Sequence, residues 1–426
     1  MMKQILSIVL CTCCITCWCA FATAQAPGIS LHDPSNLADN FYENIHASTY
    51  WYNGNEKQTR DRKAILNILD GAAYLGLNKV KYDFPKEPAS DLSGEQASKY
   101  DRQFTTALIA FSTDLLQGAG IQNLIANDEV SGRFKTKTDS AIQQWVMHIP
   151  GNKDIASYLS MLEPDDKTYR VLKKGLRSQI DSGNRKKVTQ LTDAINLYRW
   201  IAHFHFNKYV VVNIPAASLT LFDDTIHTTM KVVVGKPATR TPRFSTWCNQ
   251  IVLYPYWNVP SSIARKELLP QFRRSPAKVD AMNMQILNAQ GKIVDPYTIN
   301  WQALSSTNFP YRIRQCTGCD NALGVIKFNL TDPFNVYLHD TNFKLAFMSD
   351  KRYLSHGCIR VSEPVELGNL LLGRALDTTF LKACLKKQEP VAIDLKTQVP
   401  VFVIYSIPSV SGDTMTYYRD VYRLYN

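Results

Sequence analysis

The sequence predicts an α+β protein in which an N-terminal helical domain is followed by a mostly-β domain that carries a long insertion. Apolar residues recur every three or four positions from about residue 30 to residue 205, as they do on amphipathic helices. From about residue 206 the pattern changes to short β-branched runs bounded by Pro and Gly. Residues 258–320 then interrupt the strands with a segment rich in Pro and Gly, which predicts a lid over a cleft.

The composition is that of a globular chain large enough for two or three domains. The 426 residues are 45% hydrophobic and 20% charged, with a formal net charge of +11. Lys and Arg are spread along the whole chain, with no arginine-rich tract and no zinc-finger spacing. We therefore expect no nucleic-acid partner and interpret the excess charge as mild attraction to an anionic envelope.

Residues 1–24 have the pattern of a secretory signal peptide. Lys3 precedes an apolar run from Ile5 to Ala22, and Ala22-Thr23-Ala24 is a typical cleavage site. An uncleaved membrane anchor is the alternative, because the run approaches the ~20 residues that span a bilayer. No later stretch reaches that length, so we expect export to the periplasm or cell envelope, with no membrane span after cleavage.

Three apolar stripes predict helices in the N-terminal region. They comprise Tyr100, Phe104, Leu108, Phe111 and Leu115; the apolar positions between Ile65 and Ala73; and Leu191, Ile195, Tyr198 and Ala202. Pro150, Gly151, Pro164 and Asp165 are expected to separate helices. These helices carry no catalytic set of residues, so we expect them to form a scaffold.

Six short runs predict the strands of the second region: residues 209–214, 230–235, 325–328, 336–339, 401–405 and 417–422. Ser362 is expected to cap a helix that begins with an acidic residue and Pro364.

His339 and Cys358 are the strongest candidates for chemistry. The run Tyr337-Leu-His339-Asp-Thr ends a predicted strand, and fifteen residues separate His339 from Ser355-His356-Gly357-Cys358-Ile-Arg360. A thiol is weakly ionised at neutral pH, so a nucleophilic cysteine needs a neighbouring base, which His339 can supply. Gly357 allows close backbone approach, so amides around Cys358 can face a developing oxyanion. A buried structural cysteine beside a chance histidine remains the alternative.

These two runs resemble the catalytic signature of the L,D-transpeptidases, the YkuD-type domain that remodels bacterial peptidoglycan. Further blocks resemble the large YcbB-like branch, among them Asn213-Ile-Pro215, Tyr254-Pro-Tyr-Trp257 and Asn321-Ala-Leu-Gly324 in the second region and Asn196-Leu-Tyr-Arg-Trp200 in the first. The resemblance implies a helical scaffold domain over residues 25–205 and a catalytic domain over residues 206–426, with residues 258–320 as a capping insertion. Only about thirty residues separate Tyr169 from Trp200, too few for the peptidoglycan-binding domain that large members usually carry.

The resemblance also implies a division of labour. Cys358 attacks the carbonyl between the third and fourth residues of a donor stem peptide, and His339 accepts the thiol proton. The thioester then passes to an amine of an acceptor stem, which gives a 3→3 crosslink. Amides near Gly357 and Cys358 form the oxyanion hole, with Ser355 and His356 as supports. Tyr337 is assigned to substrate binding, and Arg360 either to a substrate carboxylate or to a structural salt bridge.

The partners implied are peptidoglycan stem peptides, as donor and as acceptor. No cofactor and no metal is implied, and the oligomeric state is left open. The acceptor is open as well: another stem, a lipoprotein lysine, a free D-amino acid or water. A carbapenem is expected to acylate Cys358.

Two alternatives use the same residues differently. Cys316, Cys319, His339 and Cys358 can be grouped as a zinc site, because the first pair has ligand-like spacing, although one such pair is weak evidence. The chain can also be a non-catalytic cell-wall binding protein, against which the intact His339 and Cys358 argue.

Five of the ten cysteines fall after the signal peptide: Cys248, Cys316, Cys319, Cys358 and Cys384. An odd number in an exported chain predicts at least one free thiol. We expect Cys358 to stay free and favour a local Cys316–Cys319 disulfide. The other outcomes are two free thiols, or pairing of one of them with Cys248 or Cys384.

Overall fold

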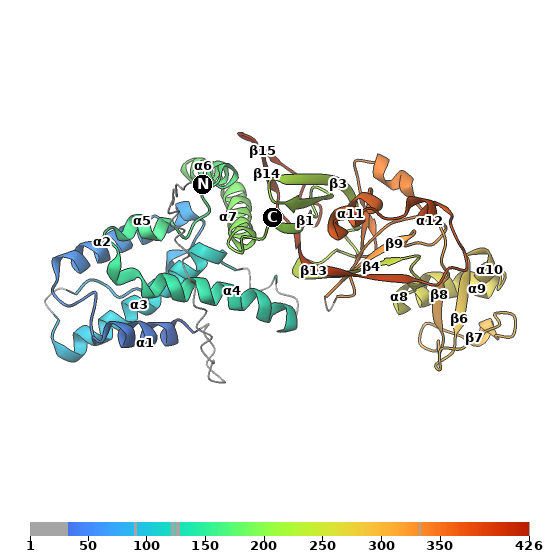
Figure 1. The fold of residues 1–426 in the computed structure, drawn as a ribbon, viewed down its shortest axis with the longest axis horizontal. Coiled ribbons are helices and arrows are strands. Elements are labelled where there is room, and N and C mark those ends of the chain that lie inside the picture. The colour runs from blue at the N-terminus through green and yellow to red at the C-terminus, as the bar shows by residue number, and fades with distance from the viewer. Residues whose placement is uncertain (1–32, 89–91, 121–123, 125–127, 332–333, 426) are drawn as a thin grey trace, which may run out of the picture.

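A computed structural model describes residues 33–88, 92–120, 124, 128–331 and 334–425. The expected signal peptide, residues 1–24, lies outside these ranges. Within them, no helix combines the length and the apolar character needed to cross a bilayer. The predicted α+β fold is confirmed: helices occupy the chain as far as Ala202, and the strands begin at Lys208 (Figure 1).

The helical region contains α1 (Pro34–Ile45), α2 (Glu56–Asp70), α3 (Gly94–Gln117), α4 (Asp128–Met147), α5 (Ile155–Ser160), α6 (Lys167–Asp181) and α7 (Arg185–Ala202). Short 3₁₀ turns at Ala72–Leu75, Lys79–Lys81 and Ile149–Gly151 join them.

The predicted stripes are the buried faces of three of these helices. Phe104, Leu108, Phe111 and Leu115 of α3 are each at most 1% exposed and pack in one core with α1, α2 and α5. Ile65 of α2 lies in the same core. Leu191 and Ile195 of α7 form a second cluster with α6.

The second region is a β-barrel. Among the described residues, nine strands join in the order β11-β3-β12-β10-β9-β4-β13-β1-β2, and the additional pairing of β3 with β2 closes all but β11 into a ring. The strands are β1 (Lys208–Asn213), β2 (Ser218–Asp223), β3 (Ile226–Gly235), β4 (Phe244–Leu253), β9 (Ile326–Leu330), β10 (Leu338–His339), β11 (Tyr353–Ser355), β12 (Ile359–Val361) and β13 (Val391–Ile404). Helices α11 (Pro364–Leu372) and α12 (Thr378–Lys382) lie between β12 and β13, and the hairpin β14 (Pro408–Ser411) and β15 (Thr414–Tyr417) follows.

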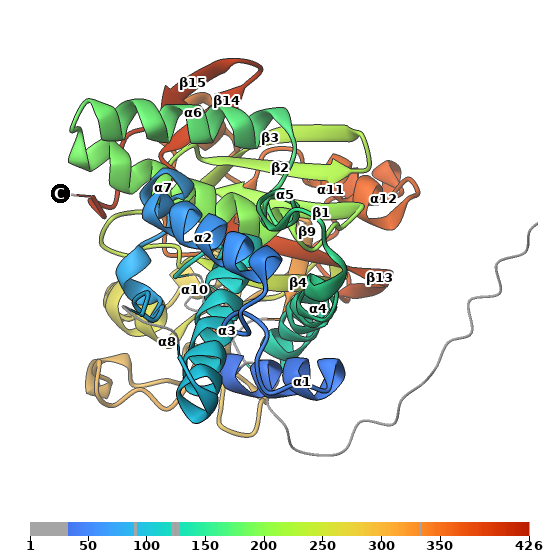
Figure 2. The same ribbon diagram turned by 90° about the vertical axis from the view of Figure 1, so that its left-hand side faces the viewer.

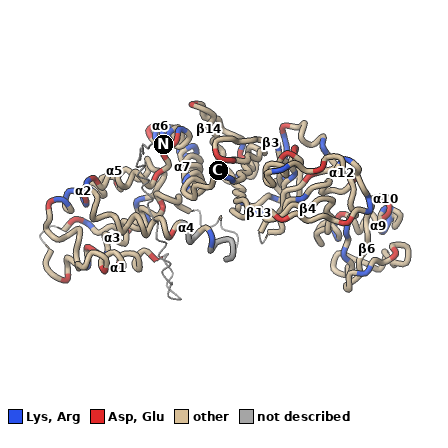
Figure 3. Tube along the Cα trace, viewed as in Figure 1, with Lys and Arg blue, Asp and Glu red and all other residues tan. Residues whose placement is uncertain are grey.

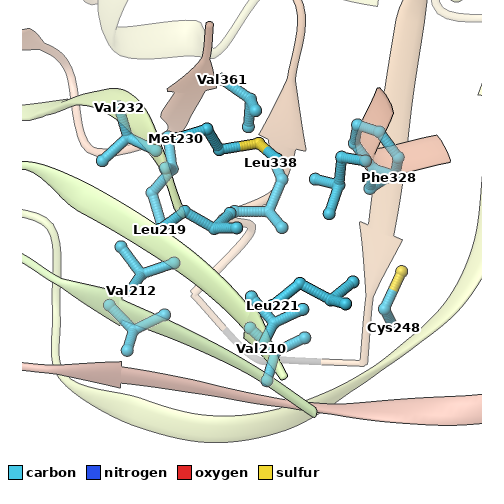
Figure 4. Close-up of a cluster of buried hydrophobic side chains, with 14 of the residues drawn as sticks. Val210, Val212, Leu219, Leu221, Met230, Val232, Cys248, Phe328, Leu338 and Val361 are labelled. Carbon is cyan, nitrogen blue, oxygen red and sulfur yellow. The ribbon is translucent and has the colours of Figure 1, made fainter. Parts of the chain in front are cut away.

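Aliphatic residues from alternate positions of these strands fill the barrel. Figure 4 shows Val210 and Val212 of β1 with Leu219 and Leu221 of β2 and side chains from the opposite wall. Leu338, Phe328 and Ile359, on the strands that carry the candidate site, are fully buried in this core. Because side chains alternate along a strand, their neighbours must point to the other face.

Three local predictions differ from the structure. The strand predicted at 401–405 is the end of the longer β13. Of the strand predicted at 417–422, only Tyr417 lies in a strand, as the last residue of β15. Tyr422 faces the barrel instead, where its Oη donates to the Gly235 carbonyl over 2.6 Å. Glu363, not Ser362, occupies the N-cap of α11, and it makes no side-chain cap hydrogen bond.

The insertion at residues 258–320 is a folded unit and not an extended loop. Helices α8 (Ser261–Ile263), α9 (Leu269–Arg274) and α10 (Lys278–Ala281), with a π-helical stretch at Ala264–Leu268, pack against the sheet β5-β8-β6-β7. Its strands are β5 (Trp257–Asn258), β6 (Met284–Leu287), β7 (Ile293–Val294) and β8 (Arg312–Gln315). Phe272, Ile286 and Trp301 lie in its own hydrophobic core, so the Pro and Gly of this segment mark turns of a small domain.

Aromatic packing joins the helical region to the barrel. Phe134 of α4 stacks on Trp247 of β4, with ring centroids 5.1 Å apart, and Trp200 Nε1 of α7 donates to Ser245 Oγ over 2.9 Å. Viewed from the helical end, α2, α3 and α4 lie in front of the barrel strands (Figure 2). Figure 1 shows the insertion at the opposite end of the molecule, and Lys and Arg are distributed over all three parts (Figure 3).

Candidate active site

The site is built on three neighbouring barrel strands. His339, at the end of β10, pairs with Lys327 of antiparallel β9 on one side and with Arg360 of parallel β12 on the other. Directly paired residues point to the same face of a sheet, so these three side chains form a row outside the barrel core. Tyr337 and Cys358 precede His339 and Arg360 by two residues and therefore belong to that face.

His339 is a buried neutral base. The residue is only 4% exposed, and its Nδ1 lies close to the Asp340 carbonyl oxygen. A carbonyl can only accept, so Nδ1 carries the hydrogen and Nε2 presents the lone pair. Burial, followed by the charges of Arg360 and Lys327, lowers the pKa of His339 to about 3, although the Asp340 contact opposes this shift. The imidazole is therefore unprotonated at neutral pH and able to accept a proton.

Asp340 fixes the turn that follows the histidine. Its carboxylate accepts the backbone N–H groups of Thr341, over 2.7 Å, and Val325, over 3.0 Å, and pairs with Lys344. Gly324 lies against it with φ +58, where an added Cβ would be 2.2 Å from Asp340 Oδ2. Position 324 therefore requires glycine, because any side chain there would collide with Asp340, the residue after His339.

The turn that carries Cys358 is held by hydrogen bonds from both sides. Ser355 Oγ accepts from the Gly357 amide over 3.1 Å and donates to the Cys358 carbonyl over 2.6 Å. Thr241 Oγ1 donates to the Gly357 carbonyl over 2.7 Å. Gly357 has φ +127, a conformation that other residues rarely adopt. Its amide is engaged by Ser355 in this structure, so Ser355 shapes the turn.

Cys358 Sγ is partly exposed and has neighbours that can stabilise a thiolate. It lies 3.7 Å from the Asn335 carbonyl oxygen. The side chain of Tyr337 hydrogen-bonds to Cys358 and also to Trp257, at the root of the insertion. Burial, with contributions from Cys358, raises the pKa of Tyr337 far above its usual value, so the hydroxyl keeps its proton and can donate it to sulfur.

Two half-buried cations complete this face. The Lys327 ammonium lies 4.4 Å from the centroid of the Tyr337 ring, and that ring meets His339 edge-on at 5.6 Å. Burial lowers the pKa of both Lys327 and Arg360, and interaction with Cys358 acts in the opposite direction on each. Both cations are therefore close enough to Cys358 for their charges to interact with it.

A cavity of about 430 Å³ opens over Cys358 and His339, and the insertion forms one of its walls. Trp257, Pro260, Ile263 and Glu267 line that wall, while Tyr337, His356 and Arg360 are among the barrel residues opposite. His356 Nε2 lies 2.8 Å from Glu267 Oε1, which ties the cysteine turn to the insertion. His356 therefore contacts the insertion, a role the sequence did not indicate.

The structure thus brings together all the residues singled out from the sequence: Cys358, His339, Gly357, His356, Ser355, Arg360 and Tyr337. The sequence did not assign Lys327, Trp257 or Glu267 to the site, although Trp257 belongs to one of the blocks that resemble the family. Lys327 alternates with the buried Ile326 and Phe328, which places it on the outer face, but only strand register shows that it faces His339. Glu267 lies far from the motif along the chain, and no sequence signal joins it to His356.

The favoured Cys316–Cys319 disulfide was wrong, and the structure has one of the other expected outcomes, a bond to Cys384. Cys319 is bonded to Cys384, with Cα atoms 5.0 Å apart, while Cys248, Cys316 and Cys358 keep their thiols. Cys316 continues strand β8, where its amide donates to the Asn283 carbonyl, and Gly318 then turns the chain toward the end of α12. The bridge also removes Cys319 as a thiolate ligand, which contradicts the zinc alternative. Within the described ranges, no three His, Cys, Asp or Glu side chains gather as a metal site would require.

Comparison with known proteins agrees with this geometry. Residues 207–393 match the YkuD family, described as an L,D-transpeptidase catalytic domain, and residues 36–176 match the family described as a scaffold domain. This chain contains an L,D-transpeptidase catalytic domain that follows a scaffold domain. A curated relative, a candidate L,D-transpeptidase of Haemophilus influenzae, is 30% identical over 283 residues, which cover 66% of this chain. The match spans only 57% of that relative's length.

Solved L,D-transpeptidases from mycobacteria show a more distant likeness. The enzyme from Mycobacterium smegmatis is 15% identical, with 46% of this chain and 58% of that chain covered, at a TM-score of 0.23. L,D-transpeptidase 3 of Mycobacterium tuberculosis is 13% identical, with 46% and 61% covered, at the same TM-score. Likeness at this level is partial, so the family assignment depends on the two family matches and the curated relative.

Proposed function

We propose that this L,D-transpeptidase joins peptidoglycan stem peptides through a thioester on Cys358. The family acts on peptidoglycan in the cell envelope, which supplies the substrate class. The observation that carries the proposal is the shared face of β10 and β12, where a neutral, buried histidine and a partly exposed cysteine line one cavity. A base beside an accessible thiol is the arrangement that nucleophilic catalysis needs.

In the first half of the reaction, Cys358 Sγ attacks the carbonyl carbon between the third and fourth residues of a donor stem tetrapeptide. The thiol proton passes to His339 Nε2, the C–N bond breaks, and the departing D-amino acid takes the proton on its amine. The lowered pKa keeps His339 unprotonated before the attack and makes its imidazolium a ready proton donor to the departing amine, whereas acceptance of the thiol proton draws on the attraction between the imidazolium and the thiolate.

In the second half, the amine of an acceptor stem attacks the thioester carbonyl. The amine proton passes to His339 and from there to the sulfur as the C–S bond breaks, which restores the Cys358 thiol and the neutral imidazole and leaves a 3→3 crosslink. Arg360 lines the cavity and is a candidate partner for a substrate carboxylate. Tyr337, which contacts Cys358, is the candidate that positions the acyl group beside the sulfur.

We assign the insertion the role of a lid. Its wall of Trp257, Pro260, Ile263 and Glu267 faces the cysteine, where it can exclude water from the thioester. Exclusion of water favours an amine acceptor over hydrolysis. We also propose that residues 1–24 are a signal peptide that delivers the chain to the periplasm.

Incubation with disaccharide-tetrapeptides, followed by mass spectrometry of the products, tests the proposal. Wild-type protein is expected to form 3→3 crosslinked dimers, and Cys358→Ser to form none. Cys316→Ser is the matched control, because it removes a free, half-buried thiol that does not line the cavity. Crosslinking retained by Cys358→Ser, or lost equally in Cys316→Ser, would contradict the assignment.

A further inference from the structure

Lys327 is a half-buried cation next to the nucleophile that the proposed reaction does not use. Its direct partner on β10 is His339, and the flanking Ile326 and Phe328 point into the barrel core. Among the ion pairs of the described residues, Lys327 has no carboxylate partner within 4.0 Å. Placing an ammonium in such a position costs free energy unless something stabilises its charge.

The contact that Lys327 does make leads to Cys358. Its Nζ lies 4.4 Å from the centre of the Tyr337 ring, a cation–π geometry, and the hydroxyl of that ring hydrogen-bonds to Cys358. The indole of Trp257 hydrogen-bonds to the same hydroxyl. The ring is therefore held on its face by an ammonium and at its tip by the insertion, with its O–H directed at the nucleophilic sulfur.

We propose that Lys327 is a positioning residue for the Cys358 thiolate, acting as one unit with Tyr337: the ammonium holds the ring so that its hydroxyl donates to sulfur. The ammonium also adds positive charge beside the sulfur. The proposal rests on the function assigned above, since it presumes that Cys358 is the nucleophile.

The other charged groups on this face do not replace Lys327. Arg360 interacts with Cys358 from β12. Among the cation–π pairs of the described residues, however, the cation on the Tyr337 ring is Lys327 and not Arg360. His339 is neutral at neutral pH. The carboxylate of Glu267 is bound to His356, and that of Asp340 to Lys344. Removing the Lys327 charge should therefore make Cys358 harder to ionise.

The pH dependence of alkylation by iodoacetamide measures this ionisation directly. The thiol loses its proton to solvent, Sγ bonds to the methylene carbon of the reagent, and iodide leaves. A Cys316→Ser background, with peptide mapping to Cys358, removes the other half-buried thiol; Cys248 is fully buried. Lys327→Met is expected to raise the midpoint by about one pH unit, the lower end of the range for a close opposite charge.

Three further variants distinguish this role from a general structural one. Lys327→Arg keeps the cation and should stay close to wild type. Lys208→Met, which removes another half-buried strand lysine of the barrel, bonded to Asp223 and to the Leu370 carbonyl, should leave the midpoint unchanged. In a Tyr337→Phe background the shift caused by Lys327→Met should shrink, because the two residues act as one unit.

Crosslinking by Lys327→Met should fall about tenfold at pH 7 and recover as the pH is raised, since one pH unit is a factor of ten in thiolate. An unchanged alkylation midpoint, or the same shift with and without the Tyr337 hydroxyl, would overturn the proposal. So would loss of crosslinking that high pH does not restore. None of these outcomes affects the assignment of Cys358, which is tested separately by crosslinking in Cys358→Ser and Cys316→Ser.

Discussion

His339 lies in an environment that disfavours its charged form. Burial and two neighbouring cations lower its pKa to about 3, against an ordinary value of 6.5. The unfolded chain therefore binds a proton at this position as the pH falls through 6.5, whereas the folded chain does not. Folding stability linked to His339 is present above pH 6.5 and is lost as the pH falls toward 3.

Replacing His339 with Gln should remove the part of the acid-induced loss of folding stability that comes from His339. Between pH 7 and pH 5 the free energy of unfolding of the wild type should fall by about 2 kcal/mol more than that of His339→Gln, by linkage from the two pKa values. Urea unfolding at the two pH values measures it. Equal losses in the two proteins would show that the folded-state pKa of His339 is not depressed.

At the scale of elements, the contact between the insertion and the cysteine turn passes through Glu267 and His356, which are 2.8 Å apart. Glu267→Gln weakens that contact without touching the insertion's core. We expect hydrolysis to tripeptide to rise relative to crosslinking, because a looser lid admits water. Asp280→Asn is the control, since Asp280 bonds Tyr297 within the insertion. The same product ratio in wild type and Glu267→Gln would contradict the lid assignment.

Deleting residues 275–300 would not be a clean test of the lid. This span contains α10, β6 and β7, and Val279, Met284 and Ile286 from it lie in the insertion's hydrophobic core. The deletion would therefore unfold the insertion and could not separate loss of the lid from loss of structure.

The disulfide between Cys319 and Cys384 ties the end of the insertion to the segment after α12 across 65 residues. Cys384→Ser should lower the free energy of unfolding by about 2–4 kcal/mol, the typical contribution of a disulfide. Cys316→Ser, which removes a free thiol from the same region, should have little effect. Denaturant unfolding and non-reducing peptide maps check both. A linked peptide containing Cys316 and Cys319 would contradict the pairing.

At the scale of the whole molecule, Phe134 of α4 joins the scaffold to the barrel. Its ring is fully buried and stacks on Trp247 of β4. Phe134→Ala should destabilise the protein by about 3–5 kcal/mol, the usual cost of removing a buried Phe ring. Tyr297→Ala, at a residue 62% exposed, is the control for loss of an aromatic ring. An unchanged unfolding temperature for Phe134→Ala in calorimetry would mean that packing between the helical region and the barrel does not contribute to stability.

Much of this molecule could be predicted from the sequence, where the signal was local. The helical period of α3 and the β-branched runs of β1 and β3 report burial directly, and both predictions hold. The runs around His339 and Cys358 indicated residues that the structure does bring to one cavity, because their residue types are those a thiol nucleophile needs.

Contacts between distant segments could not be predicted in the same way. The register that places Lys327 beside His339, the Glu267–His356 contact and the Cys319–Cys384 bridge each join residues far apart in the chain. The insertion was predicted as a lid without a sheet of its own, because its strands are only two to four residues long, too short for a periodic signal.

The most direct test of the central claim is mass spectrometry of the intact protein after incubation with a carbapenem, followed by peptide mapping. A thiolate at Cys358 should open the lactam and retain the acyl group, so the protein should gain the mass of one carbapenem, mapped to the peptide that contains Cys358. Cys358→Ser should gain none. Modification at Cys316 or Cys248, or no adduct in a protein that still forms 3→3 crosslinks, would contradict the assignment of Cys358 as the nucleophile.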